Sequence, residues 1–465
     1  MRKLTPNYRE NVAALDHLLR VDDSFDLIKK TLRVGQDELT LYYIDGFVKD
    51  VVMQKLLLPF VSLDGLGGGA QDFVERQVTY VEADVTDSVD TMVMMVLSGA
   101  TVALGSTFGS EAIVIDARTY PARDTQEPEN DRVMRGARDG FVETLVFNTA
   151  LIRRRIRDPR LTMAYHTVGE ESRTDVVLCY VEGKADPKYV DYLTERLKAI
   201  KTDALPMGHQ SLAECLIKTR WYNPFPKIRC TERPDAAAAS ILEGNVIILC
   251  DNSPEAMILP TSIFDFLQET GDYYFPPLTG CYVRLLRHSI FWVTLFLTPL
   301  WYLLVRHPEW LPGWLSFILP VEQARIPIFA QLVLTEFVID GLKLASMNTP
   351  SMLSNSLSVV GGLILGDFAV DIGWLMPEVI VYMAFVAIAN FTQPSYELGY
   401  AFKFLRMGLL ILTALFDVWG FVGGLVGAIV LVASNATVNR RRSYLYPLIP
   451  FNGRALKRLF LRVQK

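Results

Sequence analysis

The sequence predicts an α/β soluble N-terminal region of two subdomains, followed by an α-helical polytopic membrane domain of five to six spans. Residues 1–284 mix charged and apolar residues at the spacings of soluble helices and strands, and no apolar stretch there reaches spanning length. Beyond residue 284, apolar runs approach or exceed the ~20 residues that a helix needs to cross a ~30 Å bilayer core. These runs cover 289–305, 326–345, 357–375, 378–392 and 408–433.

Composition sets the domain boundaries. We expect an N-terminal α/β subdomain at 1–118, a linker at 119–140, a second α/β subdomain at 141–284, a transmembrane helical domain at 285–435, and a basic cytosolic tail at 436–465. The linker is rich in proline, glycine and charge. The first 20 residues lack the apolar core of a signal peptide, so we expect the soluble region to remain in the cytosol.

In the first subdomain, apolar and charged positions alternate at helical spacing over 7–33, which predicts a helical segment ending near Gly35. Short runs rich in β-branched and aromatic residues predict strands, and the glycine-rich segment predicts a loop. The expected order is strand 39–46, helix 47–60, loop 62–72, strand 76–83, helix 86–99, and strands at 100–106 and 111–117.

The second subdomain has the same character. Pro187 suits the first turn of a helix, and Gly244 suits the end of another. The expected order is helix 141–157, strands 161–169 and 174–183, helices 187–200, 210–220 and 233–244, and strands 245–251 and 256–260.

Charged residues inside the apolar runs are the main candidates for function, because a charge at the centre of a spanning helix costs roughly 2.5–3.5 kcal/mol. Glu336, Asp340 and Lys343 fall within roughly 60° of one another on a helical wheel of ~100° per residue. They either form a buried ion-pair set that packs one helix against another, or line an aqueous path that selects cations. Two carboxylates against one lysine leave a net negative stripe, which favours the path.

Two other positions repeat this pattern. Asp367 and Asp371 lie four residues apart in a glycine-containing run, where interhelical hydrogen bonding and pore lining are equally good explanations. Asp417 divides the last apolar run, so a tight hairpin of two short spans can form there. Lys403 and Arg406 before the hairpin, and 440–442 after it, would then both be cytosolic, which favours six spans over five.

The remaining residues indicate no enzyme, no cofactor and no metal site. The five cysteines have no C-x-x-C spacing, the five histidines stand apart from one another, and no nucleophile signature occurs. The arginines at 153–155 suit a solvated or ion-paired helix face better than nucleic acid. The net charge is −5, yet the tail after residue 435 is basic, which places it in the cytosol against anionic lipid.

Several long motifs resemble the GerA family of spore germination receptor A subunits. They cover about three quarters of the chain, and they include the acidic-proline stretch followed by R-G-x-R-x-G-F-V-E. The matching segments are 126–161, 223–235, 242–260, 264–274, 284–290, 357–373 and 388–406. The segments 272–287, 391–406 and 443–453 are most similar to a sporulation-protein branch of that family. Asp367 and the stretch 393–397 differ from the germinant-receptor pattern, which argues against direct nutrient recognition.

The resemblance implies a multi-pass protein of the inner membrane of the spore, with its N-terminal region facing the cytosol or spore core. It also implies a homo-oligomer, with a pentamer as the working number, that acts as an ion channel releasing monovalent cations during germination. Glu336 and Asp340 fall where the family tends to have glutamates. Other germination membrane proteins would be its partners. Two further classes stay open, a non-conducting scaffold that assembles receptor clusters and a secondary transporter.

Overall fold

The structure is a computed structural model that describes residues 2–48, 50–80, 82–118, 136–217, 221–321, 325–348, 369–435, 437–438 and 443–461. Its contacts divide the chain into two compact units. Unit 1 comprises Met1–Thr219 and Ile228–Thr261, and unit 2 comprises Arg220–Lys227 and Ser262–Lys465. Residues 262–284, expected to close the second subdomain, therefore pack with the helical unit. Most of the expected linker 119–140 lies outside the described residues.

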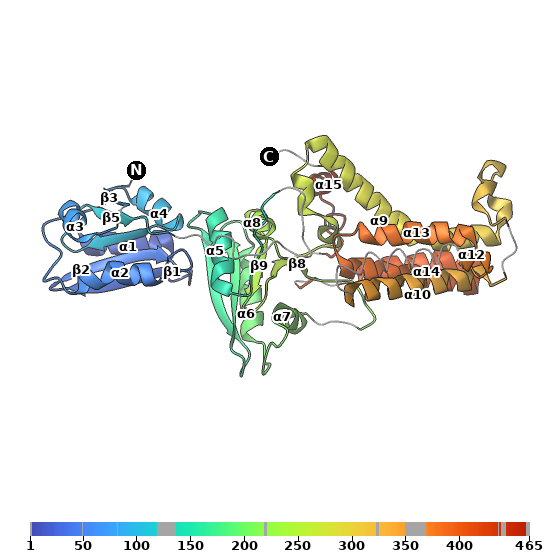
Figure 1. Cartoon of the computed structure of the whole chain (residues 1–465), viewed down its shortest axis with the longest axis horizontal. Helices are drawn as coiled ribbons and strands as arrows, with labels where there is room; N and C mark the ends of the chain where they lie inside the picture. Colours follow the sequence, from blue (N-terminus) through green and yellow to red (C-terminus); the bar gives the residue numbers. More distant parts are fainter. Residues whose placement is uncertain are drawn as a thin grey trace. The chain divides into compact units, whose positions relative to one another are not determined.

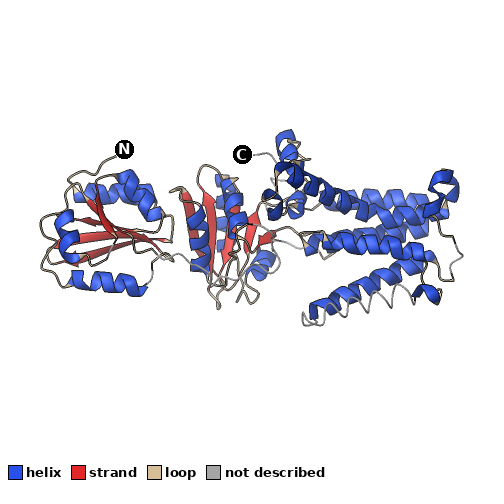
Figure 2. Cartoon of the chain, turned by 45° about the horizontal axis from the view of Figure 1, so that its top comes forward, coloured by secondary structure: helices blue, strands red, loops and turns tan. Residues whose placement is uncertain are grey.

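The first half of unit 1 is a five-stranded antiparallel sheet with helices on both faces (Figures 1 and 2). The strand order is β1-β2-β4-β5-β3. Side chains of a strand alternate between the two faces, so Tyr42 and Leu104 join a core with α1 and α4, whereas Leu41 and Ala103 join a core with α2 and α3. The elements are α1 (Tyr8–Leu19), β1 (Leu27–Val34), β2 (Asp37–Ile44), α2 (Asp50–Val61), α3 (Ala70–Gln77), β3 (Ala83–Thr86), α4 (Val89–Leu97), β4 (Thr101–Gly105) and β5 (Ala112–Ile115).

Two predictions in this half are wrong. The helical segment 7–33 breaks at Arg20, which takes the left-handed conformation that ends α1, and its second part is strand β1. Pairing with β2 over eight residue pairs decides this, since tertiary pairing outweighs a local helical pattern. The strand expected at 76–83 begins only at Ala83, because α3 extends to Gln77.

The second half of unit 1 is another five-stranded antiparallel sheet, with the order β6-β7-β9-β10-β8. Helices α5 and α8 cover one face, where Val177, Cys179 and Leu249 join their core. The elements are α5 (Leu145–Arg155), β6 (Leu161–Val168), β7 (Thr174–Val181), α6 (Pro187–Lys198), α7 (His209–Leu216), β8 (Arg229–Thr231), α8 (Pro234–Leu242), β9 (Val246–Cys250) and β10 (Ala256–Leu259). These elements agree with the predicted order, with β8 added.

The two halves of unit 1 are copies of one fold. Each has the element order αββααβαββ and the same strand order. Each half also has the same brace at its first helix. There, the side-chain amide of an asparagine accepts a hydrogen bond from the backbone N–H, and donates one to the backbone C=O, of the residue six positions earlier. Asn11 does this to Thr5, and Asn148 does it to Val142. The matching device argues for an internal structural repeat that the two stretches of sequence conceal.

A buried ion pair joins the two copies. Arg153 of α5 donates from Nε and Nη2 to the two carboxylate oxygens of Asp26, at 2.8 and 2.9 Å, and from Nη1 to the carbonyl of Leu161 at 3.0 Å. Both charged side chains are at most 1% exposed. A fully desolvated pair of this geometry requires both partners, so it fixes how the two sheets meet.

Unit 2 is helical (Figure 2). Its main helices are α9 (Pro277–Arg306), α10 (Ile328–Asn348), α12 (Ala369–Asp371), α13 (Pro377–Phe391), α14 (Tyr396–Ala433) and α15 (Gly453–Phe460). Of the described helices, α9 and α14 are long and apolar enough to cross a membrane. The predicted run 357–375 lies largely outside the described residues.

The chain reverses direction within α14, as the sequence allowed. Asp417 has a non-helical backbone (φ 59°, ψ −132°). A Cβ on Gly420 would lie 1.8 Å from the carbonyl oxygen of Leu412, eight residues earlier, which a straight helix with a 1.5 Å rise per residue could not bring about. The element is therefore a hairpin of two arms, 396–416 and 418–433.

Candidate functional site

Helix α10 and the first arm of α14 bring together the charged residues of unit 2. On α10, Glu336, Asp340 and Lys343 follow one another at helical spacings of four and three, so they share one face. On α14, Lys403 and Arg406 are three residues apart. We call these five residues the charge cluster.

Glu336 lies at the buried end of the charge cluster. Arg406 donates from Nη2 to Oε1 of Glu336 at 2.6 Å, and Nζ of Lys403 lies 3.7 Å from the same oxygen. Glu336 is 4% exposed and Arg406 is 1% exposed. Among the described residues, Nε and Nη1 of Arg406 have no hydrogen-bond partner. The pair is therefore desolvated. Removal of Glu336 leaves the Arg406 guanidinium without its carboxylate, whereas removal of Arg406 leaves Lys403 as the cation near Glu336.

The other members of the charge cluster lie nearer the surface. Asp340 forms an ion pair with Lys403, and its side chain is 39% exposed. Lys343 lies over two aromatic rings of α14, with Nζ 4.8 Å from the centre of Tyr396 and 4.7 Å from that of Tyr400. Contacts of this kind stabilise a cation by about 0.5–1 kcal/mol at exposed sites.

These partners change the charge argument made from the sequence. The carboxylates of the predicted stripe pair with cations of α14, whereas the sequence suggested Lys343 as their partner. The stripe on α10 itself carries two carboxylates and one lysine, as predicted, and the two cations of α14 bring the charge cluster as a whole to three cations and two carboxylates. Of the other predicted residues, Asp371 is exposed at the end of α12, and Asp367 lies outside the described residues.

Lys403 and Arg406 were missed because they also suit the cytosolic flank of a span. Lys403 and Arg406 are three residues apart, and Glu336 and Asp340 are four residues apart, so each pair lies on one face of its helix. This pattern could have indicated that the two helices face each other. Arg406 is buried among the helices of unit 2, and the choice of six spans over five stays a prediction.

A second polar group ties α9 to the turn of the α14 hairpin. His307, which follows α9, lies with Nε2 2.8 Å from Oδ2 of Asp417. Arg306 donates to the carbonyls of Thr413 and Ala414 at 3.3 and 3.1 Å, where the first arm ends. Hydrogen bonds to Asp417 and then to Glu309 raise the pKa of His307 above its ordinary value. The reversal at Asp417 is thus held by contacts with His307 and Arg306 at the end of α9.

The structure defines a protein with a duplicated α/β unit and a helical unit with buried charge. In the described part of the helical unit, α9 and α14 are long and apolar enough to cross a membrane. Residues 15–465 match the family model described as Bacillus/Clostridium GerA spore germination protein. The chain belongs to this family, as its motifs predicted.

The curated relatives agree with this assignment. The chain is 39% identical to stage V sporulation protein AF of Bacillus subtilis over 95% of its own length and 90% of that protein, which confirms the predicted branch. It is 27% identical to spore germination protein KA of Bacillus subtilis, with 99% and 85% covered, and 26% identical to spore germination protein B1, with 95% and 94% covered.

The chain is also similar to a solved structure, the N-terminal domain of the A subunit of the Bacillus megaterium spore germinant receptor GerK3. The likeness covers 56% of this chain and 96% of that one, at 22% identity and a TM-score of 0.41.

Proposed function

We propose that this protein is a multi-pass subunit of an oligomeric assembly that conducts monovalent cations across the inner spore membrane during germination. The observation that carries the proposal is the charge cluster, in which Glu336 and Asp340 lie near the middle of a 21-residue apolar helix. Charged residues at such depth face other helices or water, and they mark ion paths. Unit 1 would face the spore core.

In this proposal the Glu336–Arg406 pair is the closed state of the path. While Arg406 forms an ion pair with Glu336, the charge of the carboxylate is neutralised and Glu336 cannot attract a permeating cation. Breaking a buried pair costs roughly 3–5 kcal/mol, so opening requires a movement of α14 relative to α10 that gives both charges new partners or water. The exposed side chain of Asp340 would be the first carboxylate that an entering cation meets.

A non-conducting scaffold is the second candidate, and the pairing itself favours it. Both carboxylates of the charge cluster have cationic partners on α14, which is what a structural clamp between two helices needs. A scaffold of this kind would assemble germination membrane proteins and would carry no ions.

Glu336→Gln decides between the two candidates, because it removes the charge and keeps the shape. The purified variant would be compared with the wild-type protein for oligomer mass in detergent and for potassium flux from liposomes. Normal assembly with altered flux supports the conducting subunit. Lost assembly, with no flux from the wild-type protein, supports the scaffold. Glu378→Gln, in the first turn of α13, is the matched control and should change neither measurement.

Anionic lipid is the proposed ligand of the tail. Helix α15 buries Leu459 in the core of unit 2 and carries Arg454 and Lys457, which continue the basic composition of the tail. Each basic residue near an anionic surface contributes about 1 kcal/mol of binding. Replacing Arg454 and Lys457 by glutamine should weaken reconstitution into phosphatidylserine vesicles and leave phosphatidylcholine vesicles unaffected.

A further inference from the structure

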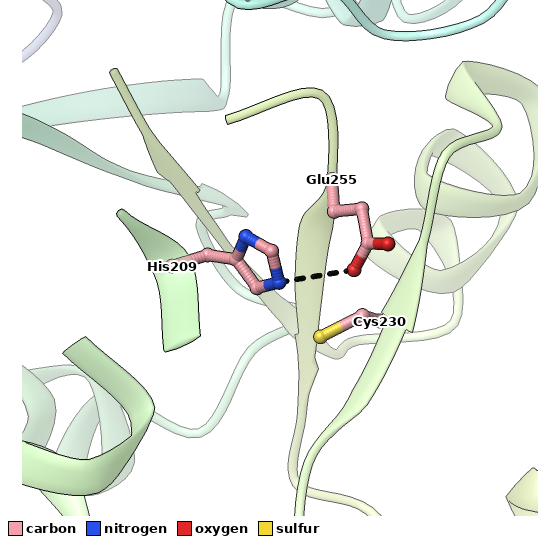
Figure 3. A group of neighbouring side chains, drawn as sticks. All are labelled: His209, Cys230 and Glu255. Carbon is pink, nitrogen blue, oxygen red and sulfur yellow. Dashed lines mark ion pairs between the residues drawn. The ribbon is translucent and has the colours of Figure 1, made fainter. Parts of the chain in front are cut away.

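Three side chains in the second half of unit 1 converge on one point (Figure 3). They are His209, Cys230 and Glu255, and one donor atom from each lies within 4.8 Å of the other two. All three residues are partly buried. The members of the group are spread over 209–255 without a recognisable spacing, and for this reason no metal site was expected from the sequence.

The strand register brings two of the three together. In the pairing of β8 with β10, Cys230 lies opposite Met257. Glu255 precedes Met257 by two positions, so by the period of two it shares the face of Cys230. Ala256 and Ile258 point the other way, into the core with α5 and α8. Cys230 and Glu255 are therefore diagonal neighbours on the face where α7 begins.

The third residue is held in place by the loop before β10. The N–H of His209 donates to Oγ of Ser253 at 3.0 Å. The preceding residue, Gly208, has φ +49°, and a Cβ there would lie 2.1 Å from the same Oγ. Only glycine allows this close approach, so the start of α7 is fixed against the segment that carries Glu255.

The donor atoms converge, which distinguishes the group from a catalytic relay. Nε2 of His209 lies 3.1 Å from Oε2 of Glu255. The same edge of the imidazole faces the sulfur of Cys230 (Figure 3). A cysteine nucleophile needs the thiol at one ring nitrogen and the carboxylate at the other. Here the carboxylate meets Nε2, and the sulfur lies on the same side of the ring, which is the arrangement of ligands around a common centre.

We propose that His209, Cys230 and Glu255 form a binding site for a divalent transition metal, with Zn²⁺ as the best match. Imidazole and thiolate ligands select Zn²⁺ over Mg²⁺ and Ca²⁺. Zinc holds nitrogen and oxygen ligands at about 2.0–2.2 Å and sulfur at about 2.3 Å, so bound ligand atoms are separated by roughly 3–4 Å. The His209–Glu255 separation already fits, and because all three donor atoms lie within 4.8 Å of one another, no separation needs to close by more than about 1 Å. Three protein ligands leave a fourth position for water or a further group.

Metal content of the untagged, full-length protein tests the site. The protein would be stripped with a chelator, loaded with Zn²⁺ or Co²⁺, and measured for bound metal and for thiolate-to-cobalt absorption. We expect one Zn²⁺ per chain and a thiolate signal with Co²⁺. Cys230→Ser should abolish the signal and weaken Zn²⁺ binding by at least 100-fold. Cys215→Ser, in α7 but outside the group, should behave as wild type.

Ser253→Ala keeps all three ligands and removes only the anchor of His209, so it tests the geometry even if a ligand variant fails to fold. Loss of an outer partner of this kind should weaken binding by about 10–100-fold. The proposal is overturned if the wild-type protein binds no stoichiometric Zn²⁺, or if Cys230→Ser and Cys215→Ser bind equally. Rapid alkylation of Cys230 without metal binding would also overturn it, in favour of a reactive thiol.

Discussion

Arg153→Ala should be the most destabilising single change at the junction of the two sheets in unit 1. The variant removes three hydrogen bonds and leaves the carboxylate of Asp26, which is 1% exposed, without its cation. Breaking a buried pair on one side costs roughly 3–5 kcal/mol. For a unit of this size, about 2–4 °C per kcal/mol gives a decrease in the melting temperature of roughly 6–20 °C.

The assay is thermal and urea unfolding of a fragment ending at Thr261, which contains unit 1. Arg154→Ala is the matched control, because the neighbouring side chain is exposed and should change the free energy of unfolding by less than about 0.5 kcal/mol. Combining Arg153→Met with Asp26→Asn should cost less than the sum of the single changes, since the unpaired charge is gone. A cost below about 1 kcal/mol for Arg153→Ala would refute the account of the junction.

Three further predictions concern other parts of the chain. Gly420→Ala should destabilise the α14 hairpin by at least about 2 kcal/mol, because the added carbon meets the Leu412 carbonyl. The control Gly423→Ala should be tolerated, since nothing lies within 4 Å of a Cβ at that position. Equal melting temperatures of the two variants in detergent would contradict the reversal of the chain. His307→Gln should lower the melting temperature most at low pH. Since the pKa of His307 is raised in the folded protein, the stability that this residue contributes is fully present below the ordinary pKa of about 6.5 and is lost as the pH rises through the raised pKa. A difference in melting temperature between variant and wild type that grows with pH would be inconsistent with this. Asn11→Ala and Asn148→Ala should each lower the free energy of unfolding of the fragment ending at Thr261 by about 1–3 kcal/mol, because the two asparagines brace equivalent helices of one repeated fold. A loss of stability at only one of the two positions would argue against the repeat.

The sequence by itself determined the larger divisions of this protein. Strand and helix periods showed two α/β stretches, and the length of the apolar runs showed a helical region after them. Asp417 in the last run indicated the hairpin, because a lone carboxylate in an apolar helix is costly unless the chain can expose it. Long motifs identified the family before any geometry was known. Such features depend on neighbouring residues, and the sequence displays neighbouring residues directly.

Tertiary structure alone decided the partners of the charged and metal-binding side chains. Glu336 pairs with Arg406, 70 positions away, and both lie on helices whose own sequences would suit several neighbours. The segment 27–34 became a strand because β2 pairs with it, against its local helical pattern. His209, Cys230 and Glu255 meet because a strand register and a glycine bring three separate elements to one point. Contacts between distant segments depend on packing, which leaves no fixed spacing in the chain.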